Sequence, residues 1–212
     1  MSEPIPDYFD LPLRQFVEDS AAGKPTPGGG SVTSMSAVLG VSLARMAAAY
    51  TLGNAKLADV HDRVRELDSR LAEADGLFRR MVVEDMEAYL AYVEARKTVD
   101  TPEFREQRRQ ATLAVVAVPT EITALASATL KACDELKDVA SSYLLSDLLA
   151  AAHLLHGACQ AAAVNARLNL KNLTDDRLLN TYRAQITGAL SHAELHLASI
   201  RAAINEKLAL PS

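Results

Sequence analysis

Two aspartates fall on helix stripes that are otherwise apolar. From Val60 to Met81 the apolar residues follow one another at alternating steps of four and three, and the next step of four reaches Asp85. Asp147 is placed in the same way, on a stripe that continues to Leu154. A carboxylate on an apolar face destabilises a fold unless it is paired or hydrogen-bonded. The position of Asp85 therefore needs an explanation. It could form a structural ion pair, a rotation of the helix could expose it to water, or it could take part in acid–base chemistry.

A loop with two prolines and three consecutive glycines precedes a helix of small residues. It runs from Lys24 to Ser31, and we expect Ser31 to cap the helix that Val32 begins. The free N–H groups at a helix start carry a partial positive charge, and glycine lets a carboxylate or phosphate approach the backbone. The loop therefore predicts an anion site, with a tight turn that only permits close packing as the alternative. It matches neither a Walker motif nor a dinucleotide fingerprint.

Metal and nucleophile chemistry find little support in the residue pattern. None of the five histidines follows a glutamate by three positions, so the pattern of di-metal carboxylate bundles is missing. His192 and His196 lie four residues apart and could bind one metal ion, but no third ligand is evident, and solvent-facing histidines are the alternative. No GxSxG motif or activated-cysteine context occurs. We therefore predict no metal site.

Acid–base chemistry is what the remaining residues favour. Asp85, Asp147 and Glu121 are the candidate proton donors and acceptors. The glycine loop, together with Lys24 or Lys56, would hold an anionic ligand.

Helical periodicity extends over nearly the whole chain, and no stretch alternates with the period of a strand. We predict an all-α bundle of about six helices, two of them long, in a single domain of residues 1–212. Long helices leave flanks that a second copy can cover, which predicts a homodimer. The expected helices are Leu11–Ala22 with Asp10 as N-cap, Ser31–Thr51, Leu57–Arg96, Phe104–Leu136 with a kink or a new start at Pro119, Val139–Leu173, and a last helix after Thr174-Asp175-Asp176 that ends near Leu208.

Composition excludes several classes of partner. The 212 residues carry a net charge of −5, with basic residues dispersed among acidic ones, so we expect no nucleic-acid partner. The apolar run from Val32 to Tyr50 is interrupted by Arg45 and rich in small residues, which favours a buried helix over a membrane span. Two cysteines without metal-ligand spacing, and an amino terminus unlike a signal peptide, predict a cytoplasmic protein.

Seven sequence blocks in one order resemble the formiminotetrahydrofolate cyclodeaminase / methenyltetrahydrofolate cyclohydrolase family. The block Lys-Pro-Thr-Pro-Gly-Gly-Gly-Ser, within residues 23–32, is the most specific of them. The other six are Leu11-Pro12-Leu13-Arg14-Gln15-Phe16, Thr51-Leu52-Gly53, Glu84-Asp85 with Ala88-Tyr89, Val118-Pro119-Thr120-Glu121, Ser146-Asp147-Leu148, and Val164-Asn165-Ala166-Arg167-Leu168-Asn169-Leu170-Lys171.

The resemblance implies an all-α homodimer that binds tetrahydrofolate, the carrier of the substrate, at or near the subunit contact. Its members convert 5-formimidoyltetrahydrofolate to 5,10-methenyltetrahydrofolate with release of ammonia, or hydrolyse the methenyl compound to 10-formyltetrahydrofolate. Carried over to this chain, the resemblance implies catalysis by Asp85 and Asp147, with Glu121 orienting them or contacting the pterin. The substrate-binding residues would be Lys24, Pro27, Gly28, Gly29, Gly30, Ser31, Lys56 and Asn165.

Three short segments depart from the family pattern. Where the family usually has a Gly-Lys-Lys segment ending in Tyr, this chain has Asn54-Ala55-Lys56-Leu57. A common Asn-Leu-Thr is replaced by Ala49-Tyr50-Thr51, and an upstream Asn is missing from Ser141-Ser142-Tyr143-Leu144. One positive charge and two amides are thereby lost. The alternative to an enzyme is a non-catalytic homologue that binds folate or another anion and whose buried carboxylates are structural.

Overall fold

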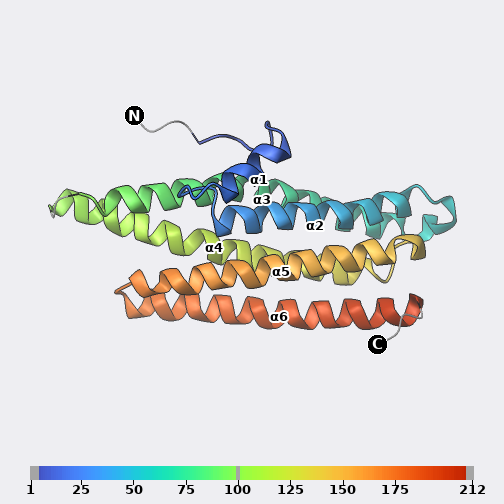
Figure 1. Ribbon diagram of the computed structural model, residues 1–212. Coiled ribbons are helices and arrows are strands. Elements are labelled where there is room, and N and C mark those ends of the chain that lie inside the picture. The colour runs from blue at the N-terminus through green and yellow to red at the C-terminus, as the bar shows by residue number, and fades with distance from the viewer. Residues whose placement is uncertain (1–4, 99–100, 209–212) are drawn as a thin grey trace.

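The computed structural model describes residues 5–98 and 101–208, and this part of the chain contains helices and no strands. The predicted all-α class is confirmed. Six α-helices follow one another, with three short 3₁₀ turns between them (Figure 1). In chain order they are α1 (Leu13–Ala21), α2 (Gly29–Leu52), the turn η1 (Ala55–Val60), α3 (His61–Ala95), α4 (Pro102–Leu136), the turn η2 (Ser142–Leu144), α5 (Leu145–Asn169), the turn η3 (Leu170–Asn172) and α6 (Asp176–Leu208).

The long helices α2 to α6 run side by side as an elongated bundle, and short α1 lies across one flank of it (Figure 1). The predicted stripe of α3 is buried in the core, with Leu67, Leu71 and Phe78 fully covered. Small residues let α2 approach α5 closely. At Gly40, an added Cβ would lie 3.1 Å from Leu155 Cγ and 3.2 Å from the Ala151 carbonyl oxygen. The expectation that this apolar run is a buried helix is therefore confirmed.

Pro119 lies inside α4, which runs without a break from Pro102 to Leu136. A proline has no N–H, so the carbonyl four residues earlier, that of Val115, loses its helical partner. Asn169 of α5 replaces that partner, since its Nδ2 donates to the Val115 carbonyl oxygen at 2.6 Å. One amide from a neighbouring helix thus compensates the proline and lets α4 continue.

Several helix boundaries differ from the expected ones. Pro12, not Asp10, is the residue before α1, and α3 begins at His61 after the η1 turn. The N-cap of α2 is Gly28, so Ser31 lies inside the first turn and does not cap it. Side chains cap the starts of two other helices: Thr101 accepts from the N–H of Phe104, and Asp175 accepts from the first turn of α6.

By length and apolar composition alone, α2 and α4 would each suit a membrane. In each of them 56 % of the most apolar window is buried inside the bundle. Packing against neighbouring helices therefore accounts for their apolar character.

Candidate active site

The first turn of α2 binds the Asp85 carboxylate of α3. The Ser31 N–H and the Ser31 hydroxyl both donate to Asp85 Oδ2, each at 2.9 Å. Ser31 N–H is one of the helix-start donors that an N-cap side chain would normally satisfy, and Gly28 has no side chain to do so. The expected anion site at the glycine loop is therefore filled by a carboxylate of the same chain. This explains both the glycine cap and the aspartate on the α3 stripe.

Two glycines make room for the side chains that converge at this point. A Cβ on Gly30 would overlap the carboxyl group of Asp85. A Cβ on Gly29 would lie 3.0 Å from Nδ2 of Asn165, which reaches the loop from α5. The glycines are thus needed for the close approach of Asp85 and Asn165 to the backbone.

A cavity of about 290 Å³ opens beside Asp85. We call it the Asp85 pocket. It is formed by the glycine loop, α3, α4 and the end of α5, and its lining residues are Pro25, Thr26, Gly28, Gly29, Gly30, Asp85, Tyr89, Pro119, Asn165, Leu168 and Asn169. The walls combine one carboxylate, two amides and a tyrosine with apolar side chains, the usual composition of a small-molecule site.

Burial raises the pKa of Asp85 above its ordinary value, and the two hydrogen bonds from Ser31 oppose that shift. No ion pair to Asp85 exists within residues 5–98 and 101–208, so the structural ion pair considered from the sequence does not explain this residue. A desolvated carboxyl group that faces a cavity and has no cation beside it is suited to proton transfer or to binding a cationic centre.

Asp147 does not reach the Asp85 pocket of its own chain. It lies in the first turn of α5, whereas Asn165 lies near the last. Eighteen residues of helix separate them, which is about 27 Å along the axis. Asp147 is half-buried and forms no ion pair with the described residues. The structure therefore brings together Asp85, the glycine loop and Asn165, but not Asp147.

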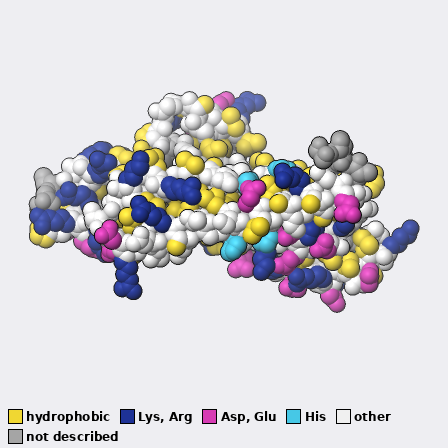
Figure 2. Space-filling model, turned by 90° about the horizontal axis from the view of Figure 1, so that it is seen from below, with side chains coloured by type: hydrophobic (Ala, Val, Ile, Leu, Met, Phe, Trp, Pro, Cys, Tyr) yellow, Lys and Arg dark blue, Asp and Glu magenta, His cyan; other side chains and the backbone are white. Residues whose placement is uncertain are grey.

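Glu121 faces a different cavity. It is exposed and lines a groove of about 720 Å³ between α4 and α6. Although the residue as a whole is exposed, partial desolvation of its carboxyl group is the main reason that its pKa is raised, and the charge of nearby Glu84 adds to the shift. Figure 2 views the molecule from the α6 side and shows histidine side chains near the middle of this face. The groove is larger than the Asp85 pocket but contains no helix N-terminus or glycine loop among its lining residues.

The two lysines and Pro27 also lie outside the Asp85 pocket. Lys24 is exposed and pairs with Asp19 of α1 at 3.0 Å. Pro27 is a buried residue of the loop. Lys56 is exposed in the η1 turn, beyond the far end of α2.

Both histidines of the α6 pair line the α4–α6 groove. His196 Nδ1 also lies 2.9 Å from Asp134 Oδ2 of α4. Within the described residues no group of three metal-ligating side chains is found.

Comparison with known proteins places this arrangement in a family. The family model described as formiminotransferase-cyclodeaminase matches residues 12–188. The chain belongs to the formiminotransferase-cyclodeaminase family. The matched range contains α1 to α5, the Asp85 pocket and Asp147.

Relatives of this family carry two activities in their names. The chain is 31 % identical over 204 residues to the formimidoyltransferase-cyclodeaminase of Rattus norvegicus, covering 94 % of this chain. It spans only 38 % of that longer relative. It is 26 % identical over 193 residues to the methenyltetrahydrofolate cyclohydrolase of Methylorubrum extorquens, covering 85 % of this chain and 89 % of the relative.

A solved structure of the family has the same fold. The formiminotetrahydrofolate cyclodeaminase of Thermotoga maritima superposes with a TM-score of 0.79 at 26 % identity, covering 94 % of this chain and 96 % of the other. The resemblance drawn from the sequence blocks is therefore confirmed.

Outside the glycine loop, two lining residues with hydrogen-bonding side chains were not among the candidates drawn from the sequence. Tyr89 stands one helical turn after Asp85, and Asn169 one turn after Asn165. Helical spacing from a candidate residue was the signal that could have found both. Asn169 also supports the wall, because it satisfies the carbonyl freed by Pro119.

Proposed function

We propose that this chain is a folate one-carbon enzyme that acts on the carbon bridging N5 and N10 of tetrahydrofolate. Relatives with either of two names, cyclodeaminase and cyclohydrolase, support this class. The single observation that carries the proposal is the partly buried Asp85 carboxyl group, hydrogen-bonded to the start of α2 and facing a cavity.

The two candidate reactions share a tetrahedral carbon between two nitrogens. In the cyclodeaminase reaction, N10 attacks the formimidoyl carbon of 5-formimidoyltetrahydrofolate, and the departing nitrogen takes up a proton and leaves as ammonia. In the cyclohydrolase reaction, water adds to the cationic methenyl carbon and one of its protons is lost. The other proton is transferred to N5 as the C–N5 bond breaks and the formyl C=O of 10-formyltetrahydrofolate forms. Each needs a group that transfers a proton and a negative charge near the amidinium.

Asp85 can meet both needs. Its raised pKa brings its titration closer to neutrality, where a carboxyl group is an effective acid or base. Ser31 holds Oδ2, and Oδ1 remains for the substrate. In its ionised form the group would stabilise the cationic bridge. Asn165 lies across the glycine loop from Asp85 and can donate to or accept from the pterin.

The size of the pocket limits what it holds. At about 290 Å³ it stands at the lower end of small-molecule sites, which span roughly 300–1,000 Å³. A molecule as long as a folate would fill it with one part only. We infer that the pterin and the one-carbon bridge enter the pocket while the remainder lies along the surface.

Absorbance of the methenyl compound tests the proposal directly. Purified protein is supplied with 5-formimidoyl- or 5,10-methenyltetrahydrofolate, and the change is compared with the uncatalysed rate. We expect rising absorbance from the first substrate for a cyclodeaminase, or accelerated loss from the second for a cyclohydrolase. Asp85→Asn should reduce the rate about 10²- to 10⁴-fold. Glu87→Gln, an exposed position two residues further along α3, is the matched control and should retain activity.

A binding role without turnover is the second candidate, and the position of Asp147 favours it. One of the two expected catalytic aspartates is about 27 Å from the pocket along α5. Titration calorimetry with 10-formyl- and 5-formyltetrahydrofolate distinguishes the two. If the protein binds these folates, Asp85→Asn weakens the binding and neither substrate is turned over, the protein binds folate without catalysing a reaction.

A further inference from the structure

The α4–α6 groove contains a buried hydroxyl group that the protein itself does not use. Ser127 of α4 lines the groove and is only 6 % exposed. Its hydroxyl forms no hydrogen bond within residues 5–98 and 101–208, whereas Thr123 and Thr129 on the same helix each donate to a carbonyl one turn earlier. Burying a hydroxyl without a partner is unfavourable. Ser127 therefore indicates that a ligand group completes its hydrogen bonding.

Three side chains that can carry a positive charge line the groove near Ser127. Lys131 follows Ser127 by one turn on the same face of α4, and His192 and His196 are one turn apart on one face of α6. The two faces lie at the same level, because Asp134, one turn beyond Lys131, is hydrogen-bonded to His196 at 2.9 Å. We call Ser127, Lys131, His192 and His196 the Ser127 cluster.

The Ser127 cluster is available to an anion. Among the described residues, neither Lys131 nor His192 has a hydrogen-bond or ion-pair partner. Asp134 occupies Nδ1 of His196 and leaves Nε2 for a ligand. Asp134 also pairs with Lys137 at 2.9 Å and is not a lining residue of the groove. An oxyanion at this end would therefore meet several donors and no carboxylate of the groove wall.

The opposite end of the groove has a different chemistry. Glu121 lies ten residues before Lys131 on α4, which is about 15 Å along the helix axis. Gln185 and Tyr182 line the same end from α6, and in the described part of the chain neither of them forms a side-chain hydrogen bond. A carboxylate and an amide can recognise the polar edge of a nucleobase, and a tyrosine ring can stack on its face.

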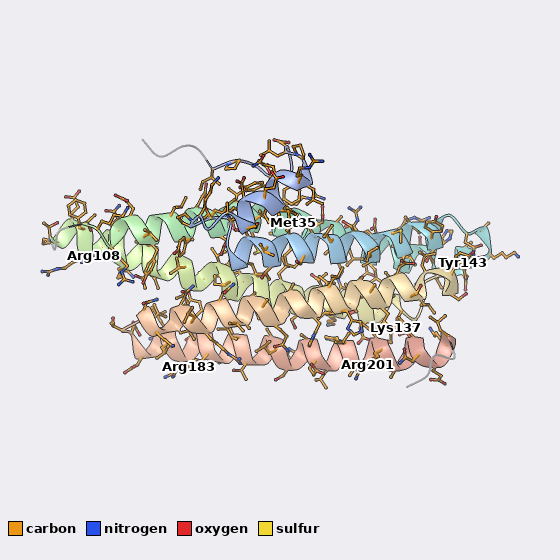
Figure 3. All side chains as sticks on the ribbon, viewed as in Figure 1. Met35, Arg108, Lys137, Tyr143, Arg183 and Arg201 are labelled. Atoms are coloured by element: carbon orange, nitrogen blue, oxygen red, sulfur yellow. The ribbon has the colours of Figure 1, made fainter. Side chains whose placement is uncertain are left out.

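Small residues separate the two ends and leave room for the body of a ligand. They come from both helices and are Ala124, Ala128, Ala184, Gly188 and Ala189. A Cβ on Gly188 would meet nothing within 4 Å. The volume of about 720 Å³ lies within the range of roughly 300–1,000 Å³ for small-molecule sites. Figure 3 shows Arg183 and Arg201 on α6, and the groove-lining stretch 184–196 lies between them.

We propose that the α4–α6 groove is a second ligand site, which binds a nucleoside 5′-phosphate with its phosphate at the Ser127 cluster and its base toward Glu121. The phosphate accepts charge-assisted hydrogen bonds from Lys131 and the protonated histidines, and a further one from the Ser127 hydroxyl. The base stacks on Tyr182, and its amino group donates to Glu121. The site does not rest on the proposed function, because the groove and the Asp85 pocket share no lining residue.

The arrangement of the donors favours a phosphate over the carboxylates of a folate tail. The four groups of the Ser127 cluster come from two helices and lie within about one turn of one another. A compact anion with three oxygens can meet all of them at once. Two carboxylates on a flexible tail would each meet fewer donors and would lose more freedom on binding.

Titration calorimetry with the purified full chain tests the site. The probes are adenosine 5′-monophosphate (AMP), inorganic phosphate and adenosine. We expect AMP to bind at least about tenfold more tightly than either of the other two, because only AMP occupies both ends of the groove. AMP that binds no more tightly than inorganic phosphate, or no more tightly than adenosine, overturns the proposal.

Substitutions in the Ser127 cluster locate the phosphate. Lys131→Met should weaken AMP binding about 10- to 100-fold, and Ser127→Ala about 3- to 10-fold. Since the Ser127 hydroxyl has no partner among the described residues, Ser127→Ala should not lower the thermal stability of the unliganded protein. Arg201→Met is the matched control, because it removes an exposed positive charge of α6 that does not line the groove. Equal losses in Lys131→Met and Arg201→Met would overturn the site.

Filling the middle of the groove locates the nucleoside. Gly188→Leu places a side chain over the floor and should abolish the preference for AMP over inorganic phosphate, while phosphate itself still binds. Gly76→Leu on α3 is the control, because a Cβ there also meets nothing within 4 Å and Gly76 does not line the groove. It should bind AMP as the wild type does. Unchanged AMP binding by Gly188→Leu overturns the proposed position of the nucleoside.

Competition distinguishes this site from the folate site. Saturating 10-formyltetrahydrofolate should leave AMP binding unchanged, and Asp85→Asn should bind AMP as the wild type does. Displacement of AMP by the folate would assign the groove to the substrate and overturn a nucleotide site. A protein that binds AMP but turns over neither folate would lose the proposed function and keep this site, and one that turns over folate without binding AMP would show the reverse.

Discussion

Asp85 and Asp147 occupy equivalent positions in the sequence pattern and very different places in the structure. Each interrupts an apolar stripe of a long helix. Asp85 finds the start of α2 and the glycine loop within its own chain. Within residues 5–98 and 101–208, no side chain forms a hydrogen bond with Asp147, which remains half-buried one helical turn from the exposed Tyr143. A position on an apolar stripe therefore does not by itself decide what a carboxylate contacts, because the hydrogen bonds of Asp85 come from another helix.

The largest effect on activity should come from disturbing the contacts that Asp85 makes with the start of α2. Gly30→Ala places a methyl group where the Asp85 carboxyl group lies, and a short side chain cannot move away without leaving Ser31. A displacement of about 1 Å at a reacting group costs about 10²-fold in rate. We therefore expect kcat/KM to fall at least about 100-fold, measured by the methenyl absorbance assay.

Gly76→Ala is the control for that substitution, because a Cβ on Gly76 meets nothing within 4 Å. It should keep full activity and gain slightly in stability, since alanine favours a helix. Equal activity of the two variants would show that the geometry at Gly30 is unimportant for the reaction.

The wall of the Asp85 pocket should be the next most sensitive feature. Asn169→Leu removes the donor to the Val115 carbonyl that Pro119 leaves unpaired. A buried acceptor without a partner costs about 1–3 kcal/mol in the free energy of unfolding, measured by urea denaturation. In a Pro119→Ala background, residue 119 regains its N–H, so the cost of Asn169→Leu should shrink. An equal cost in both backgrounds would show that the Asn169 amide does not act by compensating Pro119.

The sequence predicted most of this fold because helical periodicity and apolar stripes are local signals. The seam of α3 and the small-residue helix α2 were both confirmed. The start of α2 could not be predicted correctly, because its cap comes from Asp85, 54 residues further along the chain. The continuity of α4 through Pro119 depends likewise on an amide from another helix.

For the site, the residue types were predictable and their distribution was not. Glycine loop, Asp85 and Asn165 converge as expected. Glu121 points into the α4–α6 groove, and Asp147 and Lys56 lie at the other end of α2 and α5. Sequence blocks report which residues a family shares, but helix geometry decides which of them meet within one chain.

Asp85→Asn and Asp147→Asn should change the stability of the folded protein in opposite directions. The pKa of Asp85 is raised by burial, so the folded protein holds this proton to higher pH than the unfolded chain does. The contribution of Asp85 to the free energy of unfolding of the wild type therefore falls as pH rises from about 4 through the raised pKa. In Asp85→Asn the amide oxygen still accepts from Ser31 and nothing ionises. Its stability relative to wild type should increase over that pH range, measured by thermal unfolding.

Asp147→Asn should behave differently. Its carboxylate lies in the first turn of α5, where a negative charge is favoured by the helix dipole by about 0.3–1 kcal/mol at an exposed position. The substitution should lower stability slightly at neutral pH. Loss of stability in both variants would mean that the Asp85 carboxylate is stabilised in place, contrary to its burial.

The smallest effect is expected from substituting Lys24, the lysine at the start of the glycine loop. Lys24 is exposed and held by Asp19, and it does not line the Asp85 pocket. Lys24→Met should leave KM within about twofold of wild type, because exposed ion pairs contribute little. A KM that rises well beyond twofold in Lys24→Met would place a cation of the site in the glycine loop itself.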